Sequence, residues 1–161
     1  MITQVDLLIE MFDNLEGLLF EYNQLTGRLS SADTENTGET QAIIEQREKL
    51  IDRMKKVKPE ITRLINSQTP DKAEAIRKMM AGETVMSDFS DDEKAVQVKV
   101  TNLLSIQTDI VKKDIDAQTR FKRKYDEIRG ELEDLQKGKK RINFYQNAKT
   151  DEKGTSYDTQ N

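Results

Sequence analysis

The residues best suited to binding chemistry lie near the C-terminal end of the sequence. Four cations and two aromatic residues share this stretch: Lys137, Lys139, Lys140, Arg141, Phe144 and Tyr145. Basic charge interleaved with aromatic rings is typical of binding to nucleic acid or to an anionic membrane. Cations also suit the last turns of a helix, because they complement its negative end, and the whole chain carries a net charge of −4. We therefore interpret these residues as a solvated helix end and expect no nucleic-acid site.

Catalytic and metal chemistry is poorly represented in the chain. There is no His and no Cys, so the usual general base, the commonest metal ligand and the thiol nucleophile are all absent from the sequence. The Gly138-Lys139-Lys140 stretch lacks the earlier glycine of a phosphate-binding loop. The acids Asp91, Asp92 and Glu93 lack the ligand spacing of a calcium loop, and helix capping explains them. We expect no enzymatic activity, no cofactor and no metal.

The remaining chemistry is apolar, in a stripe at helical spacing that precedes the basic cluster. Its members are Phe121, Tyr125, Ile128, Leu132 and Leu135. This stripe can form intramolecular core, a surface for self-association, or a groove for the helix of a client protein. Ile142 and Tyr145 lie beyond Gly138, where helices of about 26 residues, some 40 Å long, are too short to cover them. These two residues are candidates for contact with another chain.

Two long helices are predicted before this region. Apolar residues recur at alternating steps of three and four from Leu8 to Leu29, which predicts a helix over about 4–30. A second such pattern, from Ile43 to Leu64, predicts a helix over about 40–66, with Arg47 at its one polar position. Pro59 interrupts the backbone hydrogen bonding but not the phase of this pattern, so a kink is expected rather than a break.

The second half of the chain is predicted to hold a short helix and a very long one. Thr69-Pro70-Asp71 is a start signal with an N-cap hydroxyl, and Gly82 is a stop, which together predict a helix over 70–81. A capping signal at Ser90 opens a helix expected over 91–147, because no proline follows. Such a helix would be roughly 80 Å long. Part of its apolar stripe must therefore find a partner elsewhere.

The middle of this last helix is poorly hydrophobic. The apolar pattern steps by eleven residues from Ile110 to Phe121, and Gln107 and Asp114 lie near the same stripe. Two packing zones on one helix are therefore expected. Together these features predict an all-α fold, an elongated antiparallel helical bundle or coiled coil, as a single domain over 1–147, followed by a disordered polar tail over 148–161.

Location is predicted from what the sequence lacks. The first residues have no basic segment, and Asp6, Glu10 and Asp13 interrupt what would be an apolar signal core. The longest apolar runs are far short of the roughly 20 residues that cross a bilayer. We expect a soluble, cytoplasmic protein that does not insert into membranes.

The layout resembles that of a known family. Two opening helices, the second with Arg47-Glu48-Lys49-Leu50-Ile51-Asp52, are followed by a long closing helix with Leu132-Glu133-Asp134-Leu135-Gln136-Lys137-Gly138-Lys139-Lys140 and then Tyr145. This arrangement, over nearly the full chain, resembles the FlgN-like flagellar export chaperones.

The resemblance implies a cytoplasmic chaperone of type III flagellar export. Members of that family bind the C-terminal amphipathic segments of hook-filament junction proteins (hook-associated proteins) and deliver them to the export gate. The resemblance places the client-binding region on Phe121 to Leu135 and suggests Tyr145 as the contact with the export gate. The alternative is a coiled-coil adaptor or scaffold that buries the same stripe by homodimerising. Which client is bound, and whether the chain is a monomer or a dimer, stay open.

Overall fold

The structure is a computed structural model that describes residues 1–85 and 89–155, with side chains described as far as Asn147. Four helices make up the described part: α1 (Gln4–Ser31), α2 (Thr37–Asn66), α3 (Pro70–Met80) and α4 (Asp91–Thr155). The prediction of an all-α helical bundle with one very long C-terminal helix is confirmed. The chain divides into two compact units, Met1–Thr119 and Arg120–Asn161, and the boundary falls inside α4.

Helix starts follow the local chemistry. The N–H of Asp6 donates to the Thr3 hydroxyl at 3.1 Å while the Asp6 carboxylate accepts from the Thr3 N–H at 2.8 Å, so both ends of a capping box are present at α1. Asn36 caps α2 by accepting from the Glu39 N–H, so α2 begins earlier than expected. Thr69 precedes α3 but makes no side-chain cap bond. Thr69 is the N-cap residue as predicted, but the expected capping by its hydroxyl is wrong, and Pro70 and the first-turn carboxylate Asp71 mark the start.

Most helices end close to the predicted residue, but α4 ends later than predicted. Gly82 adopts a φ of +79° just after α3, a conformation that favours glycine, and so stops that helix as predicted. By contrast α4 does not end near residue 147 but continues to Thr155, through residues expected to be a disordered tail. Residues 156–161 of that expected tail lie outside the described part of the chain. α2 also runs through Pro59 as one helix.

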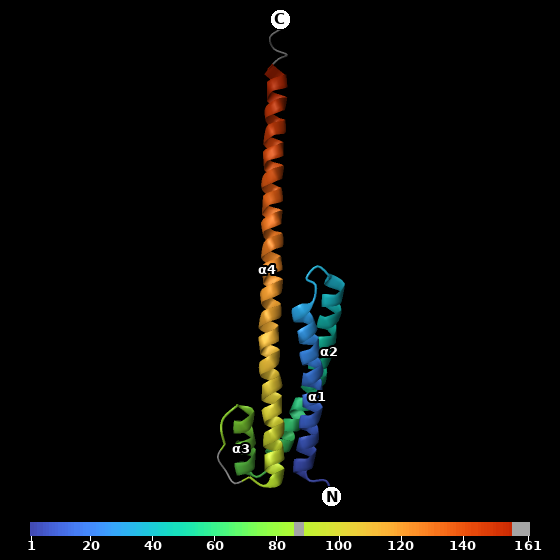
Figure 1. The fold of residues 1–161 in the computed structure, drawn as a ribbon, viewed down its shortest axis with the longest axis vertical. Helices are drawn as coiled ribbons and strands as arrows, with labels where there is room; N and C mark the ends of the chain where they lie inside the picture. Colours follow the sequence, from blue (N-terminus) through green and yellow to red (C-terminus); the bar gives the residue numbers. More distant parts are fainter. Residues whose placement is uncertain (86–88, 156–161) are drawn as a thin grey trace. The chain divides into compact units, whose positions relative to one another are not determined.

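The core of the first unit lies among all four helices. α1 and α2 form a hairpin, α3 packs at its open end, and the first half of α4 runs beside α1 (Figure 1). The buried apolar residues of this core all come from the predicted stripes except Ile65: they are Leu8, Phe12, Leu15, Leu18 and Leu19 of α1, Leu50, Met54, Ile61, Leu64 and Ile65 of α2, Ala73, Ile76 and Met79 of α3, and Val96, Val100, Leu103 and Ile110 of α4. This unit is the scaffold from which α4 continues.

Candidate protein-binding site

The predicted apolar stripe lies on the second unit, and most of it is exposed. Phe121 is half-buried, whereas Tyr125, Ile128, Leu132 and Leu135 have exposed fractions between 45% and 66%. Steps of four, three, four and three residues place all five on one face of α4. The five predicted residues therefore share one largely exposed face of α4.

The first half of the same helix behaves differently. Val96, Val100, Leu103, Ile110 and Ala117 are all buried in the first unit. Val98, Val111 and Ile115 of the same helix segment are exposed, on other faces. Along the stripe itself, the large apolar side chains are thus buried as far as Ile110 and largely exposed from Tyr125 onward. Of the two packing zones expected on either side of the step from Ile110 to Phe121, the first is buried in the core of the first unit, and the second is largely exposed.

The distal residues are also exposed. Ile142 and Tyr145, predicted to contact another chain, are both more than half exposed, and so is their neighbour Phe144. The rings of Phe144 and Tyr145 contact edge to face, with centroids 6.2 Å apart and planes at 74°. The sequence placed Phe144 only in the basic and aromatic stretch, and its exposure makes it a third exposed apolar residue beside Ile142 and Tyr145.

A polar cluster inside the first unit explains the poorly hydrophobic middle of α4. Arg47 of α2 donates from Nη2 to Asp114 Oδ1 at 2.8 Å and to the Tyr22 hydroxyl. Its guanidinium carbon also lies 4.5 Å from the centroid of the Tyr22 ring. The Arg47 side chain is 14% exposed and that of Asp114 is 30% exposed. Arg47 and Asp114, which each interrupted an apolar pattern, are therefore direct partners, and Arg47 also contacts Tyr22 of α1.

Sequence periodicity could not reveal this pairing. The sequence places Arg47 within the apolar stripe of α2 and Asp114 near the apolar stripe of α4. The two residues carry opposite charges. Their contact depends on how far each helix is shifted along its neighbour, which no single helix encodes. The opposite charge at two core positions was the available signal.

A second polar cluster lies nearby on the exposed side. The Asn23 amide donates to Asp109 Oδ2 at 2.8 Å, and Lys113 Nζ lies 2.9 Å from the same oxygen and 3.1 Å from Asn23 Oδ1. The Asn23 hydrogen bond first, and Lys113 second, lower the pKa of the Asp109 carboxyl. This contact ties α1 to α4 through a surface network.

The lowered pKa of Asp109 gives a pH-dependent prediction. A carboxyl whose folded pKa lies below its unfolded value stabilises the fold above the unfolded value, near 3.9, and this contribution disappears as the pH falls through the folded pKa. The Asn23→Ala variant should therefore be less stable than the wild type at pH 7, and the difference should shrink toward pH 3. Urea unfolding at both pH values measures it, with the exposed Asn14→Ala as control. If the stability difference between Asn23→Ala and the wild type were the same at pH 3 as at pH 7, the stabilisation would not depend on the charge of Asp109.

The acidic face of α1 makes another link to α4. Lys99 Nζ lies 2.5 Å from Asp13 Oδ1 and 3.6 Å from Glu16 Oε2. The hydrogen bond with Asp13 is the largest cause of a raised pKa at Lys99. Because these side chains are partly exposed, the pair orients the helices more than it stabilises them.

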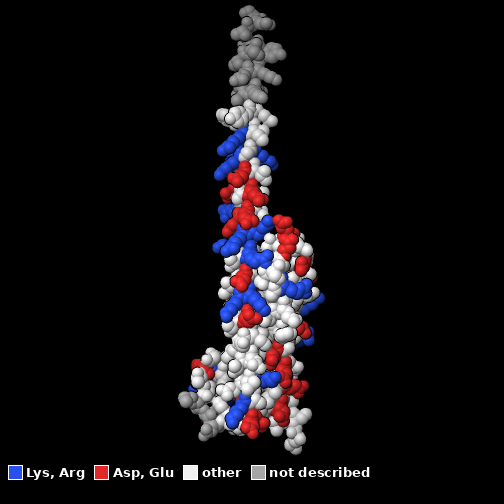
Figure 2. Space-filling view, viewed as in Figure 1, with Lys and Arg blue, Asp and Glu red and all other residues white. Residues whose placement is uncertain are grey.

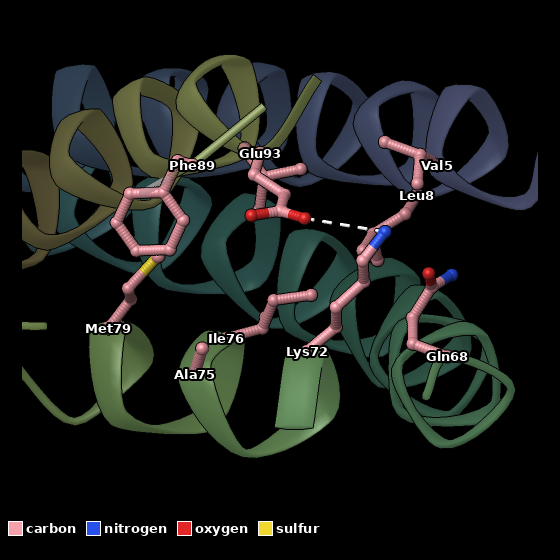
Figure 3. Close-up of a pocket in the computed structure, with 10 residues that line it drawn as sticks. Val5, Leu8, Gln68, Lys72, Ala75, Ile76, Met79, Phe89 and Glu93 are labelled. Atoms are coloured by element: carbon pink, nitrogen blue, oxygen red, sulfur yellow. Dashed lines mark ion pairs between the residues drawn. The ribbon is translucent and has the colours of Figure 1, made fainter. Parts of the chain in front are cut away.

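A small apolar cavity lies where α3 packs against the start of α4 (Figure 3). Its walls include Leu8, Ile76 and Met79, and the Lys72 ammonium lies 3.3 Å from the Glu93 carboxylate beside it. The cavity holds about 20 Å³, which is room for about one water molecule. It is too small for a cofactor or a metabolite.

Two further searches concern only the described residues. Among them, no group of three or more potential metal ligands is placed to hold an ion. Within the same residues, no helix has both the length and the apolar composition of a bilayer span.

Comparison of the chain with family models, with curated proteins and with solved structures finds no match. Function is therefore inferred from the surfaces above and from the resemblance carried by the sequence.

Proposed function

We propose that this protein is a non-catalytic chaperone that holds an amphipathic helix of a client protein on the stripe from Phe121 to Leu135. The supporting observation is the contrast along the apolar stripe of α4: its members Val96, Val100, Leu103 and Ile110 are buried, whereas four consecutive members from Tyr125 to Leu135 are largely exposed. Exposed apolar surface of this extent marks interaction sites. An amphipathic helix laid along the stripe would cover it.

The energetics favour a reversible complex. Fully burying a Leu, Ile or aromatic side chain contributes about 1.5–3 kcal/mol, and these side chains are already partly covered. Because these side chains are on average a little over half exposed, four of them would supply about 3–7 kcal/mol, which is comparable with the cost of association, about 4–15 kcal/mol. A client must add contacts of its own. Modest affinity suits a protein that has to release its client.

Charge beside the stripe counts against a parallel homodimer. In a parallel coiled coil with Ile128 at a d position and Leu132 at an a position, Lys124 occupies a g position. A g residue faces the e residue five positions further along the second copy, which here is Arg129. The next such pair is Glu131 with the neutral Gln136. One repulsive pair and no attractive pair would weaken this alternative, whereas a client with acidic flanks would be attracted.

The resemblance to FlgN-like chaperones suggests the class of client protein and the cellular location. On that reading the chain works in the cytoplasm, binds the C-terminal amphipathic segments of hook-filament junction proteins and delivers them to the type III export gate. Ile142 and Tyr145 would then contact the gate or another partner, and their exposure leaves them accessible for that role.

The test is the binding of a synthetic peptide with the C-terminal segment of a hook-filament junction protein from the same organism. The double variant Leu132→Ala/Leu135→Ala should weaken binding about 30- to 150-fold, since truncating each anchor removes about 1–1.5 kcal/mol. Isothermal titration calorimetry measures the affinity.

A matched control is Val111→Ala/Ile115→Ala, which removes two exposed apolar side chains from the same helix before the stripe. This control should bind as the wild type does. Light scattering gives the oligomeric state of each variant. A stable dimer that ignores the peptide, and that separates in the Leu132→Ala/Leu135→Ala variant, would contradict the chaperone function and support the scaffold.

A further inference from the structure

Four cations gather within five residues of the second unit: Lys137, Lys139, Lys140 and Arg141. All four are exposed, and none forms an ion pair with any residue in the described part of the chain. Basic side chains are concentrated near the far end of the described part of α4 (Figure 2). Their charge is available to an external partner.

The helix end does not explain these cations. Favourable interaction with the helix dipole falls off within the last turn. Because α4 continues to Thr155, Arg141 lies about four turns before its end. The interpretation drawn from the sequence, that the cations complement a helix terminus, is therefore wrong, and the cluster needs another role.

The geometry places an aromatic anchor among the cations. Lys137, Lys140, Arg141 and Phe144 follow the spacing of residues that share one face of a helix. Phe144 is 71% exposed on this face. At about 100° per residue it lies on the opposite side of the helix from Leu135. This basic-aromatic face, defined by these four residues, is thus separate from the client stripe.

We propose that the basic-aromatic face binds the headgroup region of an anionic lipid bilayer without entering its core. Anionic headgroups are complementary to the cations, and clusters of Lys and Arg on a helix are typical of such binding. Aromatic rings are stable at the level of the headgroups, which accounts for the exposed Phe144. The proposal is independent of the client.

A nucleic acid fits the face less well. Phosphates would neutralise the cations, but a duplex gives no apolar environment to Phe144. The face is also short, about 10 Å from Lys137 to Phe144, and Glu133 and Asp134 precede it by one turn. Mobile lipid headgroups can gather at so short a patch, whereas the fixed phosphates of a duplex would extend past it to those acids.

Co-sedimentation of the full chain with vesicles tests the proposal. Vesicles of phosphatidylcholine and phosphatidylglycerol at 3:1 should bind the protein at low salt, and vesicles of phosphatidylcholine alone should not. The triple variant Lys137→Gln/Lys140→Gln/Arg141→Gln should bind about 100-fold more weakly, because each cation contributes about fivefold near an anionic surface. Phe144→Ala should weaken binding about tenfold.

A control with the same loss of charge is Lys55→Gln/Lys56→Gln/Lys58→Gln on the exposed face of α2. It should bind within about threefold of the wild type, and circular dichroism should show each variant as helical as the wild type. Three results would overturn the proposal: no binding to the anionic vesicles, equal losses in the two triple variants, or tighter binding to a DNA duplex than to the vesicles. The last would assign the face to nucleic acid.

Discussion

Replacing Phe12 with alanine is expected to lower the free energy of unfolding of the first unit by about 3–5 kcal/mol. Phe12 is completely buried in the cluster shared by α1, α2, α3 and the first half of α4. The loss combines the lost transfer of the ring from water with the cavity that it leaves. Urea unfolding followed by circular dichroism measures the change.

The same helix offers a matched control. Phe20 is 55% exposed, so Phe20→Ala removes the same atoms without opening a cavity and should cost less than about 1 kcal/mol. Total stabilities of small domains are only about 5–15 kcal/mol, so Phe12→Ala could leave the unit unfolded. Phe12→Leu, expected to cost about 1 kcal/mol, then gives the measurable series. Equal effects at positions 12 and 20 would show that the core is not where the structure places it.

Replacing Asp114 with alanine is expected to lower the free energy of unfolding by about 2–3 kcal/mol. The change leaves Arg47, a largely buried cation, without its counter-charge, while the Tyr22 hydroxyl still accepts one of its hydrogen bonds. The value lies below that of a fully buried pair, because Asp114 is partly exposed. Thermal and urea unfolding of the purified variants give the comparison.

Asp116→Ala is the matched control, since Asp116 is exposed one half-turn further along α4 and the substitution is identical. It should change stability by less than about 0.5 kcal/mol. The double variant Arg47→Met/Asp114→Ala should recover part of the loss, because it removes the unpaired charge. If the loss in the double variant equals the sum of the losses in Arg47→Met and Asp114→Ala, the favourable coupling between Arg47 and Asp114 is contradicted.

The fold was largely predictable because each helix carries its own periodicity. The stripes of α1 and α2 predicted most of the residues that form the core, Ile65 of α2 excepted, and the start signals placed most helix boundaries within a few residues. The C-terminal part of α4 was missed because the polar residues after Asn147 have no apolar period, so nothing in their pattern marks a helix.

The candidate site was predictable in part. The positions from Phe121 to Leu135 followed from spacing alone, and their exposure in the structure fits a helix with more apolar surface than its own chain covers. The pairing of Arg47 with Asp114 was not predictable, because it depends on the alignment of three helices. Burial of Ala117 was missed for a related reason: a small side chain adds little to an apolar pattern, yet fits a close helix contact.

The change of environment along α4 divides one continuous backbone into two regimes of amide hydrogen exchange. Amides near Val100 and Leu103 open only when the surrounding core opens, so their protection should follow the global stability of that unit. Amides near Leu132 are protected mainly by bonds within the helix itself, and such helices are marginal in water. Any ligand on the exposed residues would thus appear first as slowed exchange in this second regime, before the rest of the protein registers it.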